Sequence, residues 1–152
     1  MLIRLRAVLA ALWAGGLLTL ATVAAPTLFQ LLDKSTAGKV AGRYFFVEAK
    51  ASLIFAATLL LIERAIVRQE AGFPLDGARQ SPITVNLTLL LGVLLAVVVG
   101  YEVLHPMMEA ARLGQGSWTF MQLHGASMAL YAVRTMLVLA LAWRCAGQSA
   151  KV

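Results

Sequence analysis

Several ionisable and hydroxyl-bearing side chains lie within or beside long apolar stretches of this chain, and together they could hold a polar or charged ligand. The residues are Glu48, Lys50, Glu102, His124, Ser127, Tyr131 and Arg134. A charge inside a membrane costs free energy, so an ionisable residue within a membrane span is a candidate for a binding or transport site. Carboxylate, cationic and hydroxyl groups hold small solutes through charge and hydrogen bonds. We therefore predict a ligand or transport site built from these seven residues.

A metal or haem site is the most specific interpretation of the histidine and methionine side chains. His105, His124 and Met128 offer imidazole and thioether groups, which bind copper and haem iron. The alternative is that Met128 packs against its neighbours and that His124 hydrogen-bonds between helices. With one cysteine, Cys145, the chain has neither a CxxCH haem-attachment motif nor a thiolate cluster for zinc. Haem b and copper therefore both remain candidate cofactors.

Four apolar stretches have to position these side chains. They cover approximately residues 7–32, 44–62, 83–101 and 119–143. Each is long enough to cross the ~30 Å hydrocarbon core of a membrane, which takes about 20 helical residues. Lipid offers the backbone no hydrogen-bond partners, so each stretch must be helical. We predict an all-α fold, an integral membrane four-helix bundle that forms a single transmembrane domain over residues 1–152. Its predicted helices cover about 7–32, 44–68, 83–104 and 119–143.

The composition agrees with a membrane protein and argues against several other classes. Of the 152 residues, 61% are hydrophobic and 13% are charged, whereas soluble domains have about 25% charged residues. The net charge is +6, but the arginines mostly flank the spans. No basic face therefore remains for nucleic acid, and the expected partner is the lipid bilayer. The chain has no phosphate loop, nucleophile elbow or HExxH motif, which favours a role other than catalysis.

The first stretch also resembles a signal peptide. A basic start, IRLR, precedes an apolar run, and Val23-Ala24-Ala25 resembles a cleavage site. The run continues past Pro26 through Leu32, which exceeds the ~7–15 residues of a usual signal-peptide core. We therefore expect a retained helix, which Pro26 bends or ends near its outer side.

The distribution of Lys and Arg predicts how the helices are oriented. Seven lie in the N-terminus, second loop and C-terminus: Arg4, Arg6, Arg64, Arg68, Arg79, Arg144 and Lys151. Four lie in the first and third loops: Lys34, Lys39, Arg43 and Arg112. Because cytoplasmic segments carry the excess of Lys and Arg, we expect both termini in the cytoplasm.

This topology places the start of the second and fourth helices, and the end of the third, on the outer side. Four side chains are therefore expected to gather in the outer half of the bundle: Glu48, Glu102, His105 and His124. His105-Pro106 is expected to close the third helix. Arg134 lies about ten residues, or roughly 15 Å, from the cytoplasmic end of its helix. We expect it to face inward and find an acceptor, with Thr19, Thr22, Asn86 or a carboxylate as candidates, and with snorkelling towards the headgroups as the alternative.

Short local signals predict caps, turns and packing contacts. Asp33 or Ser35 is expected to cap an interfacial helical turn that leads into the second helix, and Ser117 is expected to cap the fourth helix. Asn86 is expected to hydrogen-bond between helices. The second loop carries turn and helix-start residues: Gly72, Pro74, Gly77 and Pro82. Small residues of the first helix are expected at close helix contacts: Ala10, Ala14, Gly15 and Gly16.

Longer motifs resemble a known family. They are Trp13-Ala-Gly-Gly16, Ala25-Pro26-Thr-Leu-Phe29, Ala37-Gly38, Ala41-Gly42-Arg43, Pro106 and Phe120-Met-Gln-Leu-His-Gly-Ala-Ser-Met-Ala-Leu130. Together they resemble the small four-span membrane proteins called DUF4149, or TMEM205-like, over nearly the whole chain. By this resemblance the matching positions are Trp13, Pro26, Phe29, His124 and Ser127.

The resemblance implies a four-helix integral membrane protein, which we expect in a bacterial inner membrane. A eukaryotic relative is associated with resistance to platinum drugs. The family is also distantly similar to CopD-type copper-resistance membrane domains and to the small haem-dependent protoporphyrinogen oxidase of bacteria. These similarities imply a role in resistance, in metal handling or in haem chemistry.

Three functions remain open at this point. The first is binding or transport of a small ligand, metal ion or toxic compound through the outer polar cluster. Four spans make a narrow pathway, so transport by this route favours a homo-oligomer. The second is a haem-binding membrane redox enzyme that uses His124 and His105. The third is a structural membrane subunit whose polar groups hold the helices together without a ligand.

Overall fold

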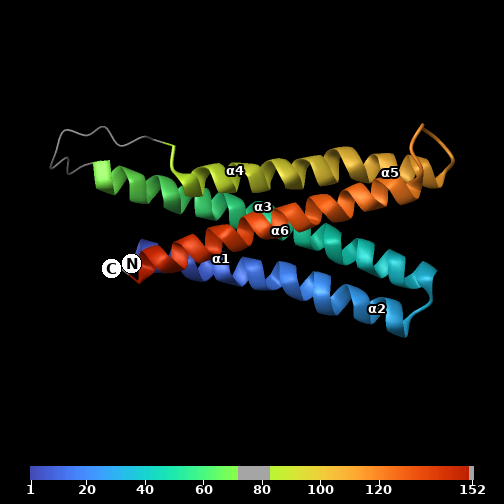
Figure 1. The fold of residues 1–152 in the computed structure, drawn as a ribbon, viewed down its shortest axis with the longest axis horizontal. Helices are drawn as coiled ribbons and strands as arrows, with labels where there is room; N and C mark the ends of the chain where they lie inside the picture. The colour runs from blue at the N-terminus through green and yellow to red at the C-terminus, as the bar shows by residue number, and fades with distance from the viewer. Residues whose placement is uncertain (72–82, 151–152) are drawn as a thin grey trace.

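Four long helices make up the described part of the protein. The structure, a computed structural model, describes residues 1–71 and 83–150 (Figure 1). Four helical spans are long and apolar enough to cross a membrane: Leu2–Leu31, Lys34–Gln69, Val85–Arg112 and Phe120–Ser149. The predicted all-α, membrane-spanning four-helix fold is thereby confirmed. The predicted turn residues of the second loop, 72–82, lie outside the described residues.

Two of the four spans contain a π-helical segment. The elements are α1 (Leu2–Thr19), η1 (Leu20–Ala24), α2 (Ala25–Leu31), α3 (Lys34–Ala71), α4 (Val85–Val98), η2 (Val99–Leu104), α5 (His105–Arg112) and α6 (Phe120–Ser149). Both α1 and α4 pack against α3 and against α6. Figure 1 shows both termini at one end, which we call the terminus end. The other end, where residues 32–33 and 113–119 connect the helices, is the loop end.

Each π-helical segment ends two residues before a proline. The segment η1 leads into Pro26 and η2 leads into Pro106. A proline ring inside a helix clashes with the carbonyl four residues earlier and removes one hydrogen bond. A wider π turn before the proline relieves that clash and lets the helix continue. The expectation that His105-Pro106 closes the third helix is therefore wrong, because α5 extends the helix to Arg112.

Side-chain caps set the start of the two helices that begin at the loop end. The Asp33 carboxylate accepts hydrogen bonds of 3.0 Å from the amides of Ser35 and Thr36, as expected for a cap of α3. Hydrogen bonds from the Thr36 side chain and amide lower the pKa of Asp33 below its usual value. For α6 the expected cap, Ser117, is wrong. Thr119 caps the helix in a capping box with Gln122.

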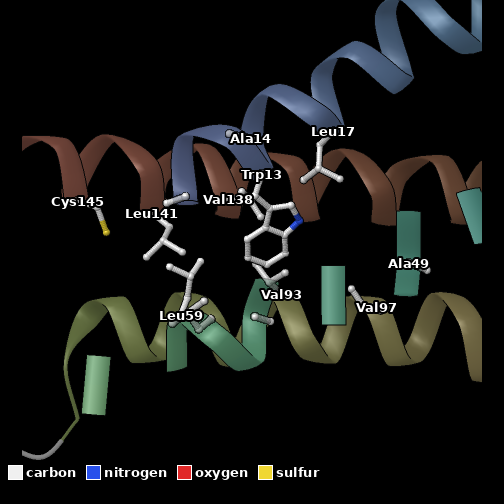
Figure 2. Close-up of a cluster of buried hydrophobic side chains, with 13 residues drawn as sticks. Trp13, Ala14, Leu17, Ala49, Leu59, Val93, Val97, Val138, Leu141 and Cys145 are labelled. Atoms are coloured by element: carbon white, nitrogen blue, oxygen red, sulfur yellow. The ribbon is translucent and has the colours of Figure 1, made fainter. Parts of the chain in front are cut away.

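The apolar core contains residues from all four spans. Figure 2 shows Trp13 and Leu17 of α1 among side chains of α3, α4 and α6. The Trp13 ring stacks on Phe55 with 5.8 Å between the ring centroids. Among the small residues expected at close contacts, Ala10 and Ala14 are buried. Gly15 and Gly16 are exposed, and a Cβ added to either would meet no atom within 4 Å.

A matched pair of glycine substitutions tests this packing. A Cβ on Gly92 would lie 3.4 Å from the Leu137 side chain, whereas one on Gly15 would meet nothing within 4 Å. We expect Gly92→Leu to destabilise the detergent-solubilised protein by about 1–3 kcal/mol through overpacking. Gly15→Leu should leave the thermal unfolding midpoint nearly unchanged. Equal loss in both variants, measured by fluorescence-detected gel filtration after heating, would contradict the arrangement of α4 against α6.

Candidate functional site

The candidate site is centred on a buried ion pair between α3 and α6. Arg134 donates from Nη2 to Glu48 Oε2, and we call these two residues the central ion pair. The Arg134 side chain is 7% exposed and the Glu48 side chain 13% exposed. The prediction that Arg134 faces inward is thereby confirmed, and among the candidate acceptors the carboxylate is the one found. Both charges lie inside helices that are long and apolar enough to span a membrane.

A chain of hydrogen bonds connects the central ion pair to α1. The Trp13 indole N–H donates to Ser52 Oγ over 2.9 Å, and the Ser52 hydroxyl donates to Glu48 Oε1. Glu48 and Ser52 are four residues apart, so their side chains lie on the same face of α3. Both carboxylate oxygens of Glu48 therefore accept a hydrogen bond. The chain joins three of the four spans through polar groups.

Tyr131 fixes the position of the guanidinium group. It precedes Arg134 by three residues on α6, and the guanidinium carbon lies 4.7 Å from its ring centroid. The Tyr131 hydroxyl donates to the Leu17 carbonyl over 2.9 Å, and Phe45 packs against the ring edge-to-face at 5.2 Å. The ring is thus held by α1 and α3, and it supports the cation from one side.

One buried nitrogen of Arg134 has no acceptor in the described part of the chain, and the same holds for Nε of Arg6. The Arg134 Nε–H is buried and makes no hydrogen bond to any residue in the described ranges 1–71 and 83–150. A buried donor without an acceptor costs free energy, typically about 1–3 kcal/mol. The central ion pair therefore contains a buried N–H donor whose hydrogen bond no described residue supplies.

Sequence reasoning missed a second buried ion pair, at the terminus end. Arg6 of α1 donates from Nη1 to Glu63 of α3, and their side chains are 5% and 4% exposed. We call them the terminal ion pair. Arg6 entered the prediction only as one of the charges that orient the helices, and Glu63 was not singled out. Arg6 and Glu63 both lie at the terminus end of their spans, as does Asn86. The predicted topology places these ends at the same level of the membrane, and this signal could have indicated that Arg6 and Glu63 form a pair.

Polar side chains surround the terminal ion pair. Thr84 donates to the Glu63 carboxylate over 2.7 Å, and Asn86 donates to it over 3.5 Å. Gln148 accepts from Asn86 over 3.1 Å and from Arg6. The prediction that Asn86 hydrogen-bonds between helices is thereby confirmed. This network contains groups from all four spans at one level.

Of the four side chains expected to gather in one cluster, Glu48 alone joins the central ion pair. Glu102 is exposed and lines a small hollow with Lys50, between α3 and the α4–η2 helix. His105 is exposed and stacks on Tyr101 at 5.2 Å, whereas His124 is exposed and stacks on Phe120 at 5.7 Å. Each imidazole therefore has an aromatic neighbour from its own span.

The structure contains little that resembles a metal centre. Within residues 1–71 and 83–150, no group of three or more His, Cys, Asp or Glu side chains could hold a metal ion. Met128 is 62% exposed, and Ser127, beside it on α6, is half-buried. Metal or haem binding by His105, His124 and Met128 therefore stays a prediction without a built site.

Removing one or both members of the central ion pair tests whether the two charges depend on each other. We expect Arg134→Met or Glu48→Met alone to destabilise the protein by about 3–5 kcal/mol, because each leaves a buried charge unpaired. The double variant should lose much less than the sum of the two losses, because it buries no charge. Denaturant unfolding in detergent, followed by helical circular dichroism, measures all three. Losses that simply add would show that the two side chains do not interact.

Comparison with known proteins identifies a family. The chain matches the model of a domain of unknown function, DUF4149, over residues 8–117. The matched range contains Glu48 and ends before α6, which carries Arg134. No curated protein matches the chain, and no solved structure does. Since the family model covers well over half of the 152 residues and four helices are long and apolar enough to cross a membrane, this chain is a member of the DUF4149 family and a four-span membrane protein.

Proposed function

We propose that this protein binds a small anion at Arg134 and moves it across the membrane. The observation that carries the proposal is the buried Nε–H of Arg134, which has no acceptor among the described residues. The sequence predicts a small ligand, metal ion or toxic compound as the solute. An unmet donor narrows this class to solutes that supply a hydrogen-bond acceptor and a negative charge.

The distribution of hydrogen bonds favours an anion over a cation. Both Glu48 oxygens already accept, one from Ser52 and one from Arg134. Arg134 has five N–H donors in a planar fork, a geometry that suits carboxylate, phosphate and similar anions. An anion that reaches Arg134 competes with Glu48 for the same guanidinium group. Glu48 therefore keeps the affinity low enough for release, which transport requires.

The energetics of buried charges also support a binding role. A buried ion pair is weak evidence for stability, because well-packed apolar residues of similar volume are often as stable or more so. Ionisable residues inside a span most often serve a ligand, ion or proton pathway. The continuous chain of hydrogen bonds from Trp13 to Arg134 favours one competing function. In that function the protein is a structural subunit, and these hydrogen bonds only hold α1, α3 and α6 together.

The proposal also includes a membrane setting for this function. We propose a bacterial inner membrane, with both termini and the terminal ion pair on the cytoplasmic side. Arg134 and Glu48 then lie within the hydrocarbon region, in the half nearer the loop end. Four spans enclose a narrow pathway, so we propose that transport takes place in a homo-oligomer. The haem-enzyme alternative gains no support from the stacked, exposed imidazoles of His105 and His124.

Anion titration of purified variants tests the proposal. In Glu48→Gln, Arg134 loses its charged competitor, so we expect nitrate to bind at least about tenfold more tightly than to the wild type, a difference of about 1.4 kcal/mol. Binding is measured by tryptophan fluorescence and by the shift in thermal midpoint, with gluconate replacing nitrate at constant ionic strength. Trp13 donates a hydrogen bond to Ser52, which in turn bonds to Glu48, so the fluorescence of Trp13 reports on changes at the central ion pair.

Two further variants complete this test. Glu109→Gln removes the same charge from an exposed surface pair and should bind nitrate like the wild type. The double variant Glu48→Met, Arg134→Met should stay folded and lose nitrate binding, together with nitrate flux in proteoliposomes. If it stays folded and retains flux, the central ion pair is structural and the proposed function is wrong.

The proposed orientation can be tested independently. In a Cys145→Ala background, Gln115→Cys places a thiol in the exposed α5–α6 connection and Ala150→Cys places one next to the end of α6. A membrane-impermeant maleimide added to intact spheroplasts should label the first variant and not the second. After permeabilisation both should react. Labelling of Ala150→Cys alone in intact spheroplasts would place the termini outside.

A further inference from the structure

A row of cations and aromatic rings crosses from α3 to η2 and α5 near the loop end. The Arg43 guanidinium carbon lies 5.0 Å from the Phe46 ring centroid. Lys50 Nζ lies 5.6 Å from the Phe46 ring and 5.6 Å from the Tyr101 ring. Tyr101 in turn stacks on His105. We call these five residues the loop-end cationic surface: Arg43, Phe46, Lys50, Tyr101 and His105.

The positive charge of this surface is not neutralised by an ion pair. In residues 1–71 and 83–150, the structure pairs Arg6, Arg112 and Arg134 with carboxylates. Within the same ranges, neither Arg43 nor Lys50 forms a salt bridge, and both side chains are exposed. Their contacts are with ring faces, which orient a cation and leave its charge available.

Apolar side chains lie next to Lys50. Lys50 lines a hollow between α3 and the α4–η2 helix, and most of its other lining residues are apolar: Ala49, Leu53, Val97, Val98 and Tyr101. Lys50 is seven residues from Arg43, or about 10 Å along the helix. A lysine at this depth extends its ammonium group towards the headgroups while its stem stays in apolar surroundings. The surface thus places two cations beside an apolar hollow, and in a membrane their side chains would extend towards the headgroups.

From this geometry we propose that the loop-end cationic surface binds an anionic phospholipid. Arg43 and Lys50 hold the phosphate group, Tyr101 lies at the level of the headgroup, and an acyl chain follows the hollow beside Leu53 and Val97. The complementarity has two parts, because the cations match the phosphate and the hollow matches the hydrocarbon. The site is separate from the central ion pair and does not depend on the proposed anion transport.

The Glu102 carboxylate allows the proposal to predict a change in lipid binding in both directions. Its carboxylate lines the same hollow as Lys50 without forming a salt bridge to it. A carboxylate near a bound phosphate repels it. Removing this charge should therefore tighten lipid binding, whereas removing Arg43 or Lys50 should weaken it. A surface that merely tolerates lipid contact would not respond in both directions.

Lipid titration of delipidated protein tests the site. Phosphatidylglycerol and phosphatidylcholine are added separately in detergent, and native mass spectrometry counts the retained lipids. We expect phosphatidylglycerol to bind the wild type, and Arg43→Gln, Lys50→Gln to weaken that binding by about tenfold or more, because each basic residue near a lipid surface contributes several-fold. Glu102→Gln should bind more tightly than the wild type. Phosphatidylcholine, which has no net charge, should bind all variants weakly.

A matched control removes the same charge elsewhere on α3. Lys34 and Lys39 are exposed near the start of the helix, and Lys34→Gln, Lys39→Gln should retain phosphatidylglycerol binding. Unchanged thermal midpoints without lipid confirm that both double variants fold. If both double variants lost phosphatidylglycerol binding equally, the proposal would be overturned, because the loss would then follow from the lower net charge alone. Inorganic phosphate that binds as tightly as the lipid would overturn it too and indicate a soluble anion instead.

Discussion

The need to neutralise Arg134 inside a membrane span determines much of the arrangement of this protein. An unpaired guanidinium group at this depth would be costly, so Glu48 must face α6. The Ser52 hydroxyl donates a hydrogen bond to the other carboxylate oxygen of Glu48, and the Trp13 indole N–H donates to the Ser52 oxygen. The positions of α1, α3 and α6 at this level are thus coupled through four side chains. Tyr131 adds a further contact by bonding the α1 backbone.

The terminal ion pair is a second buried contact between an arginine and a glutamate, and it lies at the terminus end of the bundle. Glu48 and Glu63 are fifteen residues apart on α3, which corresponds to about 22 Å of helix. The buried core lies between the two pairs, with Leu59, Leu90 and Leu141 each almost fully inaccessible. A solute at Arg134 therefore cannot pass straight to the terminus end through this core. Movement requires a rearrangement of the helices or a path between copies of the chain.

The fold was predictable because lipid allows few alternatives. Four apolar stretches of sufficient length must be helices, and the spans found in the structure agree with them in number and order. Their ends were less predictable. The prolines at positions 26 and 106 each follow a π-helical segment, so the helices continue where a helix-breaker signal suggests a stop. Backbone adjustments of this kind leave no pattern in a single sequence.

The candidate site was predictable in part. The cost of burying a charge correctly indicated that Arg134 faces inward, although its pairing with Glu48 required knowledge of the helix rotations. The same cost, applied at the ends of the spans, would have indicated Arg6 and Glu63. The prediction that the histidines bind a metal or haem had a different weakness, because it rested on residue type alone. Their stacking on Tyr101 and Phe120 depends on local geometry that periodicity does not specify.

The most direct test of the central claim is to locate an anion at Arg134. Crystals of Glu48→Gln soaked in bromide would allow the ion to be placed by its anomalous scattering. The proposed function predicts a bromide peak within hydrogen-bonding distance of the Arg134 guanidinium group, on the side of Nε. An Arg134 that still bonds only to protein groups, with bromide found elsewhere, would contradict anion binding and leave the pair a structural connection between α3 and α6.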